Sequence, residues 1–260
     1  MNIKRSQNEE VARLLRQRQE ISSQDLFLAR LTREEALQIV SASREQPPPS
    51  DSSDSGILQD VVVGSNLQSP SSPESTTSYT ELRDDALTCT RCGLAESRKN
   101  VVFSAGVEDA CVMVVGEAPG ANEDDTGLPF VGAAGKFLDL LLATVDLSRE
   151  RNTYICNVIK CRPPGNRDPM PDEIKSCSPF LTRQIQLIQP EALLAVGSFA
   201  ARLLTGREKT ALGRIRGEVH NYQGVPLIAT YHPAALLRNP KWTCAFWEDL
   251  QLLRQVLNGG

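Results

Sequence analysis

Four cysteines lie in two pairs that could bind one metal centre. Cys89 and Cys92 have two residues between them in CTRC, and Cys161 and Cys177 have fifteen between them in CRPPGNRDPMPDEIKSC. Two pairs of thiolates from separate segments can enclose a tetrahedral zinc ion or an iron–sulfur cluster, and the spacing alone leaves both open. Zinc sites more often combine two tight pairs, so the wide second pair favours a 4Fe-4S cluster.

The other three cysteines are Cys111, Cys156 and Cys244, and they lie in stretches where a free thiol behaves as a small core residue. Seven cysteines is an odd number, and the N-terminus lacks an apolar export signal, which together argue against a disulfide framework. No apolar run approaches the length that spans a bilayer. The sequence therefore predicts a cytoplasmic protein without a membrane segment.

A second group of reactive side chains follows short apolar runs. Glu117 comes directly after CVMVVG, Asn157 ends YICN, and His232 follows VPLIATY. Gly197 and Ser198 follow a fourth run, EALLAV. In open parallel sheets, ligands bind beyond the carboxyl ends of the strands, so we expect these residues to share one binding site.

The elements that must position these residues alternate along the chain. The four apolar runs predict strands, and helical patterns occur at 133–145, 171–188, 198–205 and 243–257. Continuous apolar strands separated by helices are typical of a parallel sheet that is covered on both faces. The predicted fold class is therefore α/β.

The chain divides into three predicted regions. Residues 1–41 carry two short amphipathic helical patterns, residues 42–78 form a disordered linker rich in Ser and Pro, and residues 79–260 form the domain. The N-terminal segment is a candidate site for an unknown protein partner, and we expect a monomer. The formal net charge is -4, so the chain has no general basic field and any DNA contact must be local.

The segment GEAPGANEDDTG, residues 116–127, combines glycines with carboxylates where a strand should give way to a helix. It lacks the Lys-Ser/Thr of a P-loop, and its carboxylates would repel the phosphates of a free nucleotide. Gly116 and Gly120 let the backbone approach a ligand closely. Glu123, Asp124 and Asp125 are expected to be solvated or to cap a helix.

Several motifs together resemble the iron–sulfur uracil-DNA glycosylases, family 4 of the uracil-DNA glycosylase superfamily. They occur in that family's order within residues 79–257: GEAPG, GLPFVGAAGKFLDLLL, NVIKCRPPGNRDP, VGSFAARLL, IRGEV and TYHPAALLRNP. The resemblance implies a three-layer α/β/α sandwich with a central parallel four-stranded sheet. It also implies a 4Fe-4S cluster on Cys89, Cys92, Cys161 and Cys177, with a structural role.

The implied activity is excision of uracil from single- or double-stranded DNA by base flipping and hydrolysis of the N-glycosidic bond, which leaves an abasic site. By resemblance, Phe130 lies under the uracil ring and Asn157 reads its edge. His232 stabilises the charge on the departing base, and Glu117 positions water. Family-1 enzymes have an aspartate where this chain has Ala118, which leaves two roles open for Glu117: a general base, or a group that only positions water.

The resemblance also implies DNA contacts. The loop with Leu236, Leu237 and Arg238 would fill the gap left by the flipped base, with one of the two leucines expected to cover the core instead. Ser198 would contact a phosphate through a helix N-terminus. Further candidate phosphate contacts are Lys160, Arg162, Arg167, Arg214, Arg216 and Lys241.

One alternative from another class is a non-catalytic module that binds uracil or DNA, or is associated with replication. The presence of Glu117, Asn157 and His232 together argues against it, since a binder has no need of all three.

Overall fold

The structure, a computed structural model, describes residues 78–259. The predicted helical segment 1–41 and nearly all of the predicted linker 42–78 lie outside the described residues. None of the described helices is long and apolar enough to cross a membrane. All seven cysteines are free thiols.

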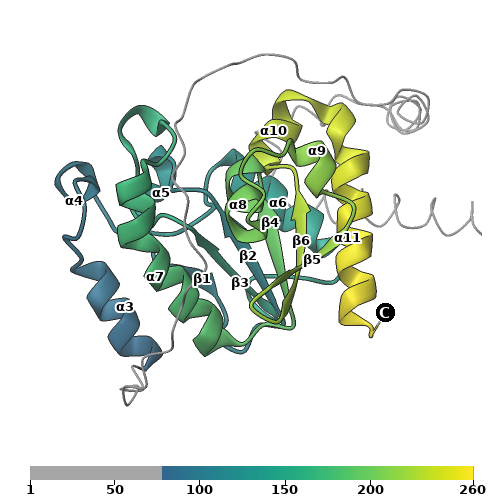
Figure 1. The fold of residues 1–260 in the computed structure, drawn as a ribbon, viewed down its shortest axis with the longest axis horizontal. Helices are drawn as coiled ribbons and strands as arrows, with labels where there is room; N and C mark the ends of the chain where they lie inside the picture. Colours follow the sequence, from purple (N-terminus) through teal and green to yellow (C-terminus); the bar gives the residue numbers. More distant parts are fainter. Residues whose placement is uncertain (1–77, 260) are drawn as a thin grey trace, which may run out of the picture.

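A six-stranded mixed sheet forms the centre of the domain, in the order β1-β3-β2-β4-β6-β5 (Figure 1). Its four inner strands are parallel and its two edge strands are antiparallel to their neighbours. The strands are β1 (Ala105–Gly106), β2 (Val112–Gly116), β3 (Thr153–Asn157), β4 (Ala192–Val196), β5 (Val219–Tyr222) and β6 (Val225–Thr230).

The four predicted strands are thus confirmed as the parallel centre, but the prediction of a four-stranded sheet is wrong at both edges. β1 has only two residues, too few to give a periodic signal. β5 alternates exposed and half-buried residues and joins β6 through a two-residue turn, where Gln223 and Gly224 have φ of 51° and 95°. Positive φ at both central positions is typical of a type I′ hairpin turn.

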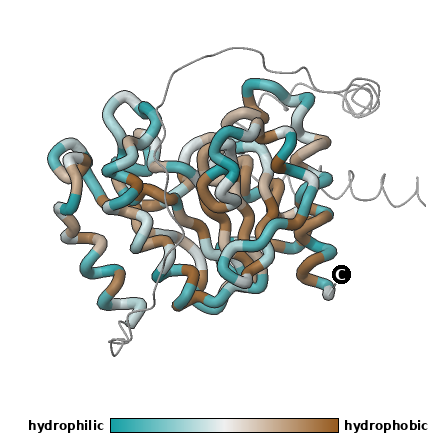
Figure 2. The backbone as a smooth tube through the Cα atoms, in the orientation of Figure 1, coloured by the Kyte–Doolittle hydropathy of each residue, from teal (hydrophilic) through white to brown (hydrophobic). Residues whose placement is uncertain are grey.

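The three-layer arrangement follows from alternation along the buried strands. On β2, Met113 and Val115 belong to one hydrophobic cluster, whereas Val112 and Val114 belong to the other. Because successive side chains of a strand point to opposite faces, each cluster covers one face of the sheet. The apolar colouring of the central strands in Figure 2 agrees with their complete burial.

Helices cover both faces (Figure 1). The first cluster includes residues of α3 (Tyr79–Leu87), α7 (Pro171–Ile188) and α8 (Ser198–Thr205). The second includes residues of α6 (Ala133–Ala143), α10 (Pro233–Arg238) and α11 (Thr243–Leu257). The remaining elements are α4 (Leu94–Ser97), α5 (Ala121–Thr126), α9 (Leu212–Ile215) and the 3-10 turns Pro164–Asn166 and Pro240–Trp242.

The predicted helices match α6, α7, α8 and α11 within two residues. Local signals explain two of their ends. Pro171 is the first residue of α7, where its missing N–H is not needed, and the Glu173 carboxylate accepts from the Met170 N–H. α8 ends at Gly206, which adopts the left-handed conformation with φ 67°.

Candidate active site and cysteine-lined cavity

The carboxyl ends of the inner strands meet at one edge of the sheet. Gly116 at the end of β2 pairs with Asn157 at the end of β3, and Val196 of β4 pairs with Thr230 of β6. β2 is the first of the four parallel strands. From β2 the chain continues to β3 on one side of it, and later returns to β4 on its other side. This reversal is the usual position of a ligand crevice in an open α/β sheet.

Phe130 lies at this edge in a loop that is held from several sides. Its φ is 54°, an uncommon conformation for a bulky residue. The Arg149 guanidinium donates to the carbonyls of Pro129 and Phe130 at 3.2 and 3.1 Å, and the N–H groups of Val131 and Gly132 donate to Glu123 Oε1, both at 2.9 Å. These contacts fix the Phe130 ring in place.

Two glycines leave room for this arrangement. A Cβ on Gly135 in α6 would overlap the backbone carbonyl of Phe130. A Cβ on Gly116 would overlap Asn157 Oδ1 and come within 2.7 Å of Phe130 Cζ. Gly116, Phe130 and Asn157 are therefore direct neighbours, as predicted for one binding site.

The Asn157 amide is buried, with 2% of the residue exposed. Within the described part of the chain, its side-chain oxygen and nitrogen form no hydrogen bond, whereas its backbone carbonyl accepts from Lys160 Nζ at 2.7 Å. Asn157 is not among the described residues with a fully buried, unpartnered polar atom, so its amide keeps access from outside the protein. The amide is thus available to a polar ligand lying beside Phe130.

His232 completes this group from the opposite side. Its ring lies 5.7 Å from the Phe130 ring, centroid to centroid, with 27° between the planes. His232 also lies against Gly197, where an added Cβ would approach His232 Cβ at 3.2 Å. The pocket therefore draws on the ends of β2, β3, β4 and β6, as predicted.

The protonation state of His232 is set by its surroundings. Burial is the main cause that lowers its pKa to about 4, the Arg238 charge lowers it further, and the Glu123 carboxylate opposes both. Nδ1 accepts from the Ala234 N–H at 3.2 Å. The neutral ring must then carry its proton on Nε2, which leaves that nitrogen as a hydrogen-bond donor.

Glu117 follows Gly116 directly and is half-buried. Burial, and to a smaller extent the Asp168 carboxylate, raise the pKa of Glu117. Its backbone carbonyl accepts from the Ile159 N–H at 3.0 Å, which fixes the backbone beside the pocket. Among the described residues, no group forms a hydrogen bond or ion pair with its carboxylate.

The four cysteines of the predicted metal site line a single cavity. It is bounded by Ala86, Cys89, Arg91, Cys92, Arg98, Lys160, Cys161, Ser176, Cys177 and Phe180. Cys161 and Cys177 are buried and Cys89 and Cys92 are half-buried. The cavity lies between α3, the start of α7 and the segment that follows β3, so the two predicted pairs do converge.

Hydrogen-bond donors are directed at two of the sulfur atoms of this cavity. Within the part of the chain that the structure describes, no three His, Cys, Asp or Glu side chains are arranged to hold a single metal ion. The Arg98 guanidinium donates to Cys161 Sγ at 3.3 Å, and the Lys160 N–H donates to Cys177 Sγ at 3.2 Å. Donors directed at sulfur are typical of iron–sulfur sites.

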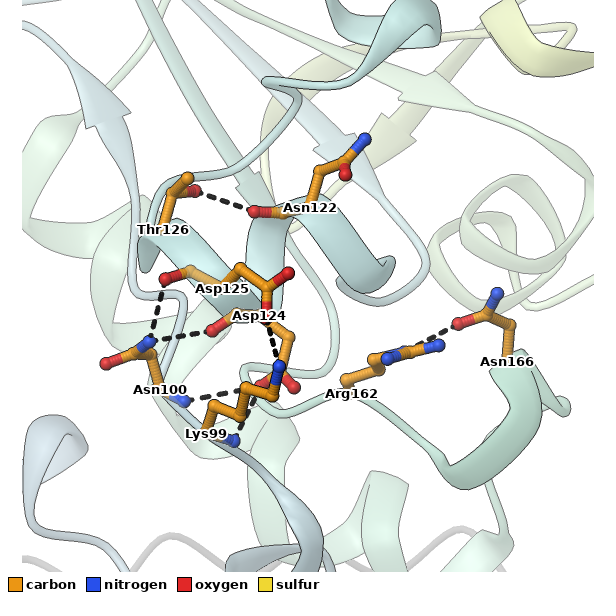
Figure 3. Close-up of polar contacts among 8 residues, drawn as sticks. All are labelled: Lys99, Asn100, Asn122, Asp124, Asp125, Thr126, Arg162 and Asn166. Carbon is orange, nitrogen blue, oxygen red and sulfur yellow. Dashed lines mark hydrogen bonds and ion pairs between the residues drawn. The ribbon is translucent and has the colours of Figure 1, made fainter.

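The acidic residues of α5 have structural contacts rather than solvent alone. Asp124 is buried and accepts the backbone N–H groups of Lys99 and Asn100 at 2.9 and 3.3 Å (Figure 3). Asp125 pairs with Lys99 Nζ at the surface. The expectation of solvated or capping carboxylates is therefore wrong for Asp124, because it anchors α5 to the segment that follows Arg98.

The residues predicted to contact DNA divide by exposure. Ser198, Leu237 and Arg238 are exposed at the same sheet edge as the pocket, and 45% of Leu237 is accessible. Leu236 is 1% exposed and packs in the core against α6. The two leucines therefore divide as expected, with Leu236 as the one that covers the core.

Four of the candidate phosphate contacts are occupied within the protein. Lys160 is buried, Arg216 pairs with the buried Asp249 at 2.9 Å, and Arg167 pairs with Glu173 at 2.6 Å. Arg162 donates to Asn166 Oδ1 at 2.8 Å, also visible in Figure 3. Among the candidate phosphate contacts, Arg214 and Lys241 are exposed, as is Arg238.

The comparisons with known proteins identify the family. Residues 103–251 match the family model described as the uracil DNA glycosylase superfamily. The chain is 43% identical over 179 residues to the type-4 uracil-DNA glycosylase of Archaeoglobus fulgidus, which covers 66% of this chain and 89% of the relative. Relatives of the same name from Sulfurisphaera tokodaii and Saccharolobus solfataricus are 40% and 41% identical over 69% and 68% of this chain, and 84% and 85% of their own.

The structure thus defines an α/β domain in which Phe130, Asn157 and His232 meet at the carboxyl ends of the strands and four cysteines line a cavity beside them. The chain belongs to the uracil DNA glycosylase superfamily, within its type-4 uracil-DNA glycosylases.

Proposed function

We propose that this protein is a uracil-DNA glycosylase that hydrolyses the N-glycosidic bond of deoxyuridine in DNA and leaves an abasic site for base excision repair. One observation carries the proposal. Phe130, Asn157 and His232, which are spread over more than a hundred positions of the chain, meet at one site with Glu117 at its edge.

The pocket suits a flipped pyrimidine. The Phe130 ring offers a flat face on which a base can stack, and the Asn157 amide offers one donor and one acceptor. Uracil presents an O4 acceptor and an N3–H donor on the same edge, and cytosine presents the reverse pattern. The unpaired amide of Asn157 is therefore the proposed basis of selectivity for uracil.

His232 is the proposed group that stabilises the leaving base. Its Nε2–H is free to donate to uracil O2, where negative charge grows as the glycosidic bond breaks. A neutral donor is available throughout the physiological range because burial keeps the pKa of His232 near 4. Removal of a single donor of this kind costs about 100- to 1000-fold in kcat in other enzymes.

Glu117 is the proposed group that faces the sugar. As uracil departs, the sugar gains oxocarbenium character, which a nearby carboxylate stabilises while it orients the attacking water. Glu117 directly follows Gly116, which borders the proposed base pocket, so the Glu117 side chain starts one residue away from that pocket. We assign it orientation of water and electrostatic stabilisation.

We further propose that Leu237 fills the gap left by the flipped nucleotide, while Arg238, Ser198, Arg214 and Lys241 contact phosphates. An exposed leucine at the rim can unstack a base step and offset the cost of unpairing. The backbone at Gly116 and Gly120 is the proposed part of the Glu117 loop that approaches the nucleotide.

The cysteine-lined cavity is the proposed site of a 4Fe-4S cluster on Cys89, Cys92, Cys161 and Cys177. When bound, the cluster supplies structural cross-linking of the segment after α3 to the segment after β3, and the hydrolysis needs no change of its redox state. Free thiols throughout the chain are consistent with a reducing, cytoplasmic setting. We also propose that the domain acts as a monomer and that residues 1–41 bind a protein partner.

The test uses single- and double-stranded oligonucleotides that contain one uracil or one cytosine at the same position. After incubation with the protein, hot alkali should cleave only the uracil strand, and His232→Ala should reduce the rate by about 100-fold or more. Asn157→Asp should raise the relative rate on cytosine. A protein that binds these strands without producing any alkali-sensitive site would be a non-catalytic binder, and the proposed activity would be wrong.

A further inference from the structure

Lys160 is a charged residue in the interior, with 2% of the residue exposed. Its Nζ donates to the backbone carbonyl of Asn157 at 2.7 Å and to Gln184 Oε1 at 2.5 Å, and it lies 5.9 Å from the centre of the Phe103 ring. These partners are neutral oxygens and an aromatic ring, and the buried Cys156 thiol also lies within reach of the Lys160 side chain. Among the described residues, no carboxylate forms an ion pair with Lys160.

Such a residue is unusual on energetic grounds. Removing an ammonium group from water costs several kcal/mol unless an opposite charge lies close to it. Two half-buried cations of the domain satisfy this rule, since Arg149 pairs with Asp139 and Arg216 pairs with Asp249. Lys160 has no such partner, and the half-buried Arg98 donates to Cys161 Sγ rather than to a carboxylate.

The surroundings of Lys160 indicate where the opposite charge belongs. The residue lines the cysteine cavity, precedes Cys161 in the chain, and donates its backbone N–H to Cys177 Sγ at 3.2 Å. A 4Fe-4S cluster held by four thiolates carries net negative charge in its common oxidised form. A cluster in this cavity would therefore supply the opposite charge that the protein itself does not.

Gln184 is oriented to serve Lys160. Its Nε2 donates to the carbonyl of Phe103 at 3.2 Å and to Tyr154 Oη at 2.7 Å. With both donors of the amide used, its oxygen is left to accept from Lys160. The ammonium position is thus fixed by a buried network rather than by chance packing.

We propose that Lys160 is the buried counter-charge of the cluster and that, through its hydrogen bond to the Asn157 carbonyl, it positions the residue that reads the base. This inference rests on the proposed function, because it assumes both the cluster and the role of Asn157. Lys160 is a positioning residue, since it contacts neither the base nor the sugar. Lys160 of the KCR motif, a candidate phosphate contact on sequence grounds, is thereby given a different role.

The test compares Lys160→Gln, Lys160→Met and Lys175→Met in the cluster-loaded protein. Glutamine keeps a donor for the Asn157 carbonyl without the charge, and methionine keeps neither. Lys175 lies on α7, two residues before Cys177, but is exposed, so Lys175→Met removes a nearby charge that solvent already screens.

Two readouts separate the two parts of the proposal. The reduction potential of the cluster should become more negative in both Lys160 variants and remain unchanged in Lys175→Met, and the cluster should be lost to a chelator about 10-fold faster. The kcat/KM for uracil excision should fall about 10-fold in Lys160→Met but much less in Lys160→Gln.

An unchanged potential in both Lys160 variants would overturn the counter-charge, and equal kcat/KM in the two would overturn the link to Asn157. Should Lys160→Met fail to fold, the potential of Lys160→Gln decides the first part, and its uracil-to-cytosine rate ratio, expected to be unchanged, decides the second. A wild-type protein without iron or without excision would instead contradict the proposed function itself.

Discussion

The base pocket and the cysteine-lined cavity lie at the same end of the sheet but are stabilised in different ways. In the pocket, contacts within the chain hold the loop of Phe130 in place. Arg149 and Glu123 form hydrogen bonds with its backbone, and Gly135 leaves room for it. The cavity is lined by four thiols together with Arg91, Arg98 and Lys160, and no carboxylate lines it. The pocket is thus preformed by the chain, whereas the cavity is the place where we propose that a bound cluster completes the structure.

The largest effect should come from removing a ligand in the cavity. Cys177→Ala should abolish bound iron and lower the free energy of unfolding by more than about 4 kcal/mol, because a metal centre is lost from a buried site. Iron content and urea unfolding measure the two effects. Cys244→Ala, in α11 and away from the cavity, is the matched control and should keep its iron. Equal iron in both variants would contradict the ligand assignment.

A pH titration tests how the pocket keeps His232 neutral. Above pH 6.5 the ring is neutral in both folded and unfolded chains, and between pH 6.5 and about 4 only the unfolded chain binds a proton. Stability should therefore fall as the pH falls through this window, by on the order of 3 kcal/mol in total.

The measurement is urea unfolding at several pH values for the wild type and for His232→Gln, which should lose this part of the slope. His220→Gln is the natural control, since His220 and His232 are the two histidines of the chain. A slope that survives in His232→Gln would mean that other groups cause it.

Adding a methyl group at Gly116 should obstruct the base pocket and slow excision, and it should leave the cysteine-lined cavity unchanged. Gly116→Ala places a methyl group against Asn157 Oδ1 and 2.7 Å from Phe130 Cζ, so we expect kcat/KM to fall by about 100-fold. Iron content should stay at the wild-type level. Gly213→Ala, where an added Cβ meets nothing within 4 Å, should leave both unchanged. Iron loss in Gly116→Ala would show that the two regions are not separable in this way.

The smallest effect is expected at the rim. Leu237→Ala should reduce excision from duplex DNA by about 10-fold, with less effect on single strands, because only the duplex has a base stack to open. Rates on matched single- and double-stranded uracil substrates give the ratio. Leu87→Ala, an equally exposed leucine of α3, should leave it unchanged. A uniform decrease on both substrates would point to a general loss of DNA affinity instead.

The features of the site that follow from the order of the strands could be predicted from the sequence. Asn157 and His232 could be placed together because the carboxyl ends of parallel strands must meet at one edge. The features it could not supply depend on packing between distant segments. Nothing near Arg149 indicates that it holds Phe130, and the burial of Lys160 in KCR is invisible in a motif that reads as basic. Gly135 did leave a trace, as a glycine inside a helical pattern.

The short helix α5 carries two adjacent carboxylates that bind two different segments of the chain. Glu123 accepts from the backbone that follows Phe130, and Asp124 accepts from the backbone that follows Arg98, the second of these contacts being drawn in Figure 3. The Arg98 guanidinium in turn donates to Cys161 Sγ. The six residues of α5 thus connect the cysteine-lined cavity to the loop of Phe130. Iron depletion should consequently slow repair even though every residue that touches the nucleotide is intact, which would make this enzyme responsive to the iron supply of its cell.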